Sequence, residues 1–156
     1  MYFVGIDISK FKHDCAIIDE LGDVITSSWS FTNDCEGFSQ FKQLLQALGG
    51  KQKIGFESTG HYTDNIRLFL ERYHYSFMEL NPLLISRFNT SKSLRKTKSD
   101  TIDAALIAQY LMTVEYKPNP PTLYHIEALK SLTRFRDNLV KLRSRQLVEL
   151  TNILDK

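Results

Sequence analysis

Four carboxylates in this sequence stand where they could act together on one charged group. Asp100 and Asp103 are three residues apart at the start of a strongly helix-forming segment, so a helix places both on one face. Asp7 and Glu57 lie in short apolar runs of strand-like composition, and each follows a glycine by two positions. Because side chains alternate across a strand, each acid shares a face with its glycine, which leaves open space beside Asp7. Oxygen ligands of this kind suit hard divalent cations such as Mg²⁺.

Each of these acids also has an ordinary structural explanation when it is taken alone. Asp100 and Asp103 can complement the dipole at the N-terminus of their helix. Asp7 can cap a turn, and Glu57 can cap the helix expected after Ser58. An unpaired carboxylate is costly to bury, so Asp7 needs a cation, hydrogen-bond donors or solvent at an edge of the sheet.

The elements that must position the acids follow from the hydrophobic pattern. Strands are predicted over residues 2–8, 13–19, 24–31, 53–57 and 75–80. Helices are predicted after Asn33-Asp34, after Ser58-Thr59-Gly60, from Asn81-Pro82, and from about residue 100 to about residue 112. Short links between the first three strands indicate an antiparallel meander. The alternating strands and helices that follow indicate an α/β fold with a mixed sheet flanked by helices.

The chain changes character after residue 112. Residues 113–124 contain three prolines and predict a linker, so one domain is expected over residues 1–112. Residues 125–156 carry apolar side chains at three- to five-residue steps, with lysines and arginines between them, which predicts a long amphipathic helix. Self-association of this helix as a coiled coil is the leading expectation. Packing on a further region of the protein, expected because nothing stops the helix before Lys156, and contact with nucleic acid are the alternatives.

Composition sets broad limits on the class of protein. The chain has 156 residues, of which 42% are hydrophobic and 24% charged, as expected for a soluble globular protein. The net charge of +2 is too small to indicate a nucleic-acid partner by itself. Cys15 and Cys35 have neither the spacing of a zinc site nor the number of a disulfide framework, so reduced thiols and a cytoplasmic location are expected. Neither a signal peptide nor a membrane span is expected.

One stretch carries charge of a single sign. Residues 87–98 contain five basic residues and no acid: Arg87, Lys92, Arg95, Lys96 and Lys98. Such a stretch can be an ordinary solvated surface. Its place directly before Asp100 and Asp103 favours contact with the phosphates of a nucleic acid instead.

Several motifs together carry a resemblance to a known family. They are Gly5-Ile6-Asp7-Ile8-Ser9-Lys10, Phe56-Glu57-Ser58-Thr59-Gly60 with Tyr62, Asn81-Pro82, and Lys96-Thr97-Lys98-Ser99-Asp100-Thr101-Ile102-Asp103-Ala104. In this order and spacing, over about residues 1–112, the chain resembles the N-terminal domain of the DEDD transposases of the insertion-sequence-110 family, which includes the Piv-type DNA invertases.

The resemblance implies a fold, a cofactor and partners. The fold would be ribonuclease H-like (RuvC-like), with a mixed five-stranded sheet flanked by helices. In it Asp7, Glu57, Asp100 and Asp103 would bind Mg²⁺, for which Mn²⁺ would substitute. The implied activity is recombination of DNA at element ends and target sites, guided by a structured bridge RNA, with nucleoid association on DNA.

The same resemblance limits what this chain is expected to do alone. The family has a further C-terminal domain with a nucleophilic serine, and no serine of this sequence stands where the family places that residue. Strand transfer by this chain alone is therefore not expected. A nucleic-acid-binding and dimerisation module without catalysis of its own is one alternative function, and a standalone junction nuclease is another.

Overall fold

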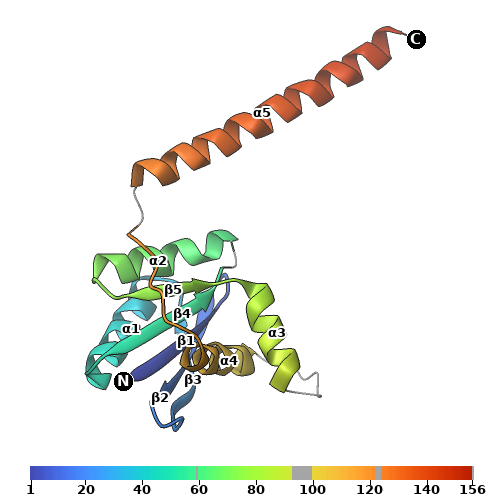
Figure 1. Ribbon diagram of the computed structural model, residues 1–156. Helices are drawn as coiled ribbons and strands as arrows, with labels where there is room; N and C mark the ends of the chain where they lie inside the picture. Colours follow the sequence, from blue (N-terminus) through green and yellow to red (C-terminus); the bar gives the residue numbers. More distant parts are fainter. Residues whose placement is uncertain (59, 93–99, 122–123, 156) are drawn as a thin grey trace. The chain divides into compact units, whose positions relative to one another are not determined.

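The computed structural model describes residues 1–58, 60–92, 100–121 and 124–155. The strands are β1 (Tyr2–Ile8), β2 (Lys12–Asp19), β3 (Val24–Thr32), β4 (Gln52–Glu57) and β5 (Phe77–Leu80) (Figure 1). The α-helices are α1 (Cys35–Leu48), α2 (Thr63–Arg72), α3 (Pro82–Lys92), α4 (Asp100–Thr113) and α5 (Tyr124–Leu154), and the 3₁₀ turn η1 (Gly60–Tyr62) precedes α2.

The strands form one mixed sheet in the order β3-β2-β1-β4-β5, with β1 at its centre. β1 pairs with β2, and β2 with β3, in antiparallel fashion. β4 pairs in parallel with both β1 and β5. Short links permit only antiparallel neighbours, whereas parallel neighbours need a helical crossover, which α1 and α2 provide. The predicted meander and the predicted mixed α/β sheet are therefore confirmed.

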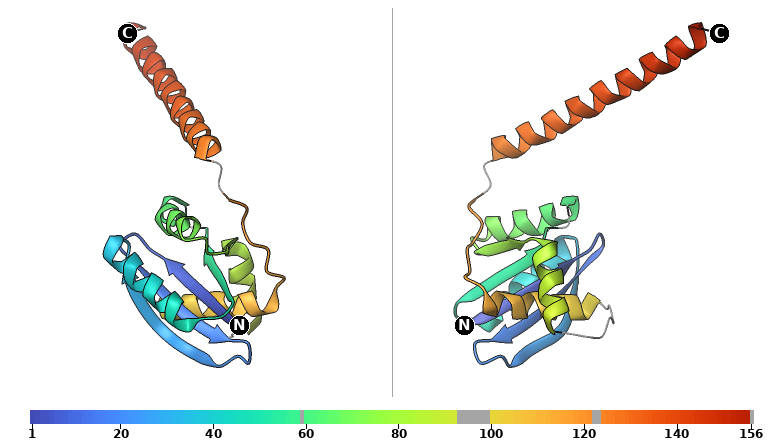
Figure 2. Two further views of the ribbon diagram at one scale, coloured as in Figure 1. Left: turned by 90° about the vertical axis from the view of Figure 1, so that its left-hand side faces the viewer. Right: turned by 45° about the vertical axis from the view of Figure 1, so that its right-hand side comes forward.

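Helices cover both faces of this sheet, because β1 and its neighbours are apolar on both sides (Figure 2). One core joins Val4 and Ile6 of β1 to Phe41 of α1 and Ile66 of α2. The other core joins Phe3 of β1 to residues of α3 and α4. The alternation of side chains along β1 thus decides which helices each residue meets.

Local signals set the ends of α1. The Asp34 side chain accepts a hydrogen bond from the Gly37 amide at 2.8 Å, as an N-cap residue does, and Gly49 follows the helix with φ 62°. Hydrogen bonds to Gly37 and Thr32 lower the pKa of Asp34. The helix was predicted to begin after Asn33-Asp34, and its start at Cys35 confirms this.

The helix after β4 begins later than Ser58. Gly60 has φ +76°, which is outside the helical region, so η1 intervenes and α2 begins at Thr63. Tyr62 occupies the N-cap position of α2, and its side chain makes no capping hydrogen bond.

The chain forms two compact units, Met1–Asn119 and Pro120–Lys156, and their division falls inside the predicted linker 113–124. The last residues of the first unit are bonded to β4 and β5. The Tyr116 hydroxyl donates to the Ser76 carbonyl at 2.8 Å, and the Asn119 amide donates to the Phe77 carbonyl at 2.8 Å. In the second unit, α5 runs for 31 residues. No helix in the described ranges is both long and apolar enough to cross a membrane.

Candidate functional site

Asp7 and Glu57 lie side by side at the C-terminal ends of two parallel strands. Ile6 of β1 is in register with Phe56 of β4, so the next residue on each strand is an acid. Gly5 and Gly55, two positions earlier, both face α4, and alternation puts the two acids on that same face. Both acids are half-buried.

The glycine before Asp7 does not leave open space, contrary to the prediction. A Cβ atom built on Gly5 would lie 2.2 Å from the Ala104 carbonyl oxygen and 2.4 Å from the Ala108 amide nitrogen. The backbone of α4 fills the space that a side chain at position 5 would take. Gly5 therefore serves to bring α4 against β1 next to Asp7.

This close approach carries Asp103 to the same region of the sheet. Ala104, Ile107, Ala108 and Leu111 are buried, and their spacing marks the side of α4 that faces the sheet. Asp103 adjoins this side and is half-buried. Position 100 lies one turn before residues 103 and 104, although the Asp100 side chain lies outside the described residues.

The carboxylates suit a divalent metal in their chemistry, since each offers hard oxygen donors. Among the side chains that the structure describes, no group of three or more His, Cys, Asp and Glu is arranged to hold a metal ion. That search leaves out Asp100, one of the four predicted ligands. The carboxylate oxygens are therefore donors of the type that Mg²⁺ prefers, and the metal-binding role of the four acids stays a prediction.

The predicted nucleic-acid-binding residues begin with Arg87 in the middle of α3 and continue past its last residue in the sequence. Arg87 is exposed on α3. The side chain of Lys92, and all of Arg95, Lys96 and Lys98, lie outside the described residues. α3 packs beside α4 through the Phe88 and Tyr110 rings, whose centroids are 5.3 Å apart.

Sequence reasoning missed Asp14. This residue is the register partner of Asp7 across β1 and β2, so the two carboxylates lie on one face of the sheet. The Asp14 side chain is only 7% exposed, and it is bonded to Lys12 and Ser30. The available signal was the short link 9–11, which pairs residues 7 and 14 once a tight hairpin is assumed.

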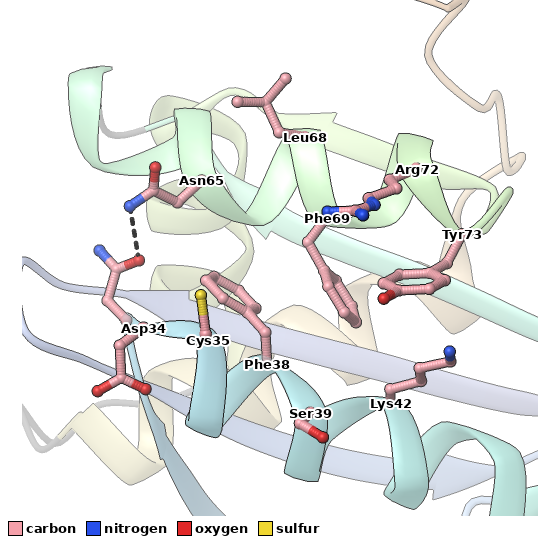
Figure 3. A pocket seen from close by; sticks show the side chains of 11 residues that line it. Asp34, Cys35, Phe38, Ser39, Lys42, Asn65, Leu68, Phe69, Arg72 and Tyr73 are labelled. Carbon is pink, nitrogen blue, oxygen red and sulfur yellow. Dashed lines mark hydrogen bonds between the residues drawn. The ribbon is translucent and has the colours of Figure 1, made fainter.

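A pocket of about 550 Å³ lies between α1 and α2, and of the acids whose side chains the structure describes, Asp7, Glu57 and Asp103, none lines it (Figure 3). Its polar residues include Lys42, whose ammonium is 3.9 Å from the centroid of the Tyr73 ring, and Asn65, which donates to Asn33 at 3.0 Å. Cys35 opens into this pocket, whereas Cys15 is buried and burial raises its pKa. Because α1 and α2 cover the opposite face of the sheet from α4, the pocket is separate from the acids.

Comparison with known proteins identifies a family and a relative that match this sequence. A family model for DEDD transposases of the IS110 type, described as transposase, matches residues 4–156. A mini-circle protein of Streptomyces coelicolor, named as a transposase for IS117, is 24% identical over 155 residues. That alignment covers 97% of this chain, and the chain spans 37% of the length of that relative.

Proposed function

Because this chain belongs to the IS110 family of DEDD transposases, we propose that it is the metal-binding domain of a DNA recombinase acting at insertion-sequence ends. One observation carries the proposal. Two acids end neighbouring parallel strands, and Gly5 brings the acid-bearing helix α4 against the same face. A structural role for a single acid does not require such an arrangement.

The strand order supports a ribonuclease H-like (RuvC-like) fold for residues 1–112. An antiparallel meander of β1, β2 and β3 continues into β4 and β5 on the other side of β1. This order puts the ends of β1 and β4 together at the centre of the sheet. A central strand end is where acids from separate parts of a chain can reach one phosphate.

We further propose that Asp7, Glu57, Asp100 and Asp103 hold Mg²⁺, or Mn²⁺ in its place. The bound ions would activate the attacking group and stabilise charge on the scissile phosphate. The half-burial of Asp7, Glu57 and Asp103 limits access of bulk water to their carboxylates. Their placement on two strands and one helix of a packed core restricts their movement relative to one another.

DNA at the element ends and the target is the proposed substrate, and a structured guide RNA is a proposed partner. Arg87, Lys92, Arg95, Lys96 and Lys98 would contact the nucleic-acid backbone. In support, their segment directly precedes α4, which carries two of the four acids.

A second candidate function is a nucleic-acid-binding and dimerisation module without chemistry of its own. It is favoured by α5, where apolar side chains at helical spacing are exposed within their unit, among them Leu129, Leu132, Phe135, Leu139 and Leu142. An apolar stripe of this length needs a partner, and a second copy of α5 would supply one.

Metal binding tests the first proposal. Calorimetric titration should show Mn²⁺ binding to the wild-type chain, and thermal melting should show stabilisation of about 2.7 kcal/mol at a hundred times the dissociation constant. Asp7→Asn and Glu57→Gln should each weaken binding at least about tenfold. Asp23→Asn is the matched control, because Asp23 is exposed in the β2–β3 turn at the other end of the sheet.

Two results would decide against the proposal. An Mn²⁺ affinity of Asp7→Asn equal to that of the wild type would contradict the proposed metal site. Equal losses of Mn²⁺ affinity in Asp7→Asn and Asp23→Asn would contradict it as well. Divalent-dependent nicking of plasmid DNA by the wild-type chain, absent in Asp7→Asn, would instead exclude the second candidate. Cleavage confined to branched DNA would favour the other alternative function, a standalone junction nuclease.

A further inference from the structure

Asp14 is a buried carboxylate directly beside the proposed metal site. It is in register with Asp7 across the antiparallel pair of β1 and β2, and 7% of its side chain is exposed. Like charges opposite each other on neighbouring strands destabilise a sheet. The repulsion between Asp7 and Asp14 must therefore be offset by a partner of opposite charge or by hydrogen-bond donors.

The compensation for Asp14 comes from two neighbours on its own face of the sheet. The Lys12 ammonium nitrogen lies 3.3 Å from Oδ2 and 3.4 Å from Oδ1 of Asp14. Ser30 of β3, the register partner of Asp14, donates a hydrogen bond from its hydroxyl to Oδ1. The Asp14 carboxylate thus accepts a hydrogen bond from Ser30 and forms an ion pair with Lys12.

Lys12 differs from Asp14 in that it reaches solvent. Its side chain is 54% exposed. Lys12 begins β2, and because β1 and β2 are antiparallel, it lies at the end of the sheet where β1 ends and Asp7 stands. An ammonium group has three donors, and a carboxylate with two oxygens leaves at least one of them for another acceptor.

We propose that Lys12, positioned by Asp14 and Ser30, binds a phosphate oxygen of the DNA backbone beside Asp7 and Glu57. This inference rests on the proposed function, because DNA must cross this end of the sheet. A fixed cation there offsets repulsion between the phosphate and the acids. Asp14 is a positioning residue, since its contact with Lys12 orders a flexible side chain before DNA arrives.

The salt dependence of DNA binding tests the contact. The full 156-residue chain is titrated by fluorescence anisotropy against a short labelled DNA duplex, without divalent metal, between about 50 and about 200 mM salt. Each phosphate contact adds about 0.9 to the slope of log K against log salt, so Lys12→Gln should lower that slope by about 0.9. Over this fourfold range, the wild type should lose about 3.5-fold more affinity than the variant does.

Two variants serve as matched controls for Lys12→Gln. Lys51→Gln removes the same charge from an exposed residue that precedes β4 at the opposite end of the sheet, and it should keep the wild-type slope. Lys12→Arg keeps the charge and should restore most of the slope.

If Asp14 positions Lys12, the change in DNA affinity caused by Asp14→Asn is opposite in sign to the change that its charge alone predicts. Asp14→Asn removes a negative charge, so a general charge effect would strengthen DNA binding. If Asp14 positions Lys12, Asp14→Asn should weaken binding and lower the slope as Lys12→Gln does, and the double variant should show no further loss. Ser30→Ala, whose volume change is small, should lower the slope in part and stands in for Asp14→Asn if that variant does not fold.

The outcomes separate this inference from the proposed function. A Lys12→Gln slope equal to that of the wild type overturns the Lys12 contact and leaves the metal proposal intact. Stronger binding by Asp14→Asn overturns the positioning role. Absence of DNA binding by the wild type overturns the proposed DNA partner, and the Lys12 contact with it.

Discussion

Gly5→Ala tests whether close packing of α4 on β1 sets the position of the acids. The added methyl group would lie 2.2 Å from the Ala104 carbonyl oxygen and 2.4 Å from the Ala108 nitrogen. Ordinary contact begins at 3.4 Å, so α4 must retreat by about 1.2 Å. Both obstructing atoms belong to the backbone, so no side-chain rotation can relieve the overlap.

The expected cost is at the upper end of the range for overpacked cores, about 3 kcal/mol. For a unit of this size, that corresponds to a fall in melting temperature of roughly 12 °C. Because α4 also carries Asp103, a displacement of about 1 Å should weaken Mn²⁺ binding at the proposed site by at least about tenfold. Calorimetric melting and Mn²⁺ titration of the same preparation would measure both effects.

Gly55→Ala is the matched control, because Gly55 is the register partner of Gly5 on β4. The three atoms nearest its methyl group would all belong to the Leu111 side chain, whose two Cδ atoms lie at 2.8 Å and 2.9 Å, and that side chain can rotate away. We expect a cost of about 1 kcal/mol and little effect on Mn²⁺ affinity. The entropy that either substitution removes from the unfolded chain is the same and cancels in the comparison. Equal losses in the two variants, or a smaller loss in Gly5→Ala, would refute the reasoning.

Two further predictions concern polar side chains of the first unit, Tyr116 and His13. Tyr116→Phe removes a hydroxyl that donates to the Ser76 carbonyl and accepts from the Ile54 amide, so the free energy of unfolding in urea should fall by about 1–2 kcal/mol. Tyr73→Phe is the control, because the Tyr73 ring is partly exposed, and it should leave the free energy of unfolding unchanged. Burial lowers the pKa of His13 below 6.5, an effect that Asn33 and Asp14 only partly oppose. The unfolded chain then binds the proton more readily, so stability should fall as the pH drops below about 6.5 and level off above it. Urea titrations from about pH 5 to about pH 8 should show this slope in the wild type but not in His13→Phe, and an equal slope in both would contradict the assignment.

Much of the fold was predictable because it depends on local preferences. The apolar runs of β1 and β4, the cap at Asp34 and the glycine stop at Gly49 act within a few residues of themselves. The first residue of α2 was less predictable, because amino-acid composition does not fix the φ angle of Gly60. The bonds of Tyr116 to β4 and to the Ser76 carbonyl were not predictable either, since the partners lie 62 and 40 residues away in sequence.

The sequence by itself determined which acids stand on strands and on a helix, because period and composition are local properties. It also determined the family, through motifs that run in a fixed order. Only the tertiary structure decided that the space at Gly5 is filled by the backbone of α4, and that the Asp14 carboxylate is buried and bonded to Ser30 of β3. Those facts depend on strand register and on packing between residues about a hundred positions apart, which arise only when the core forms.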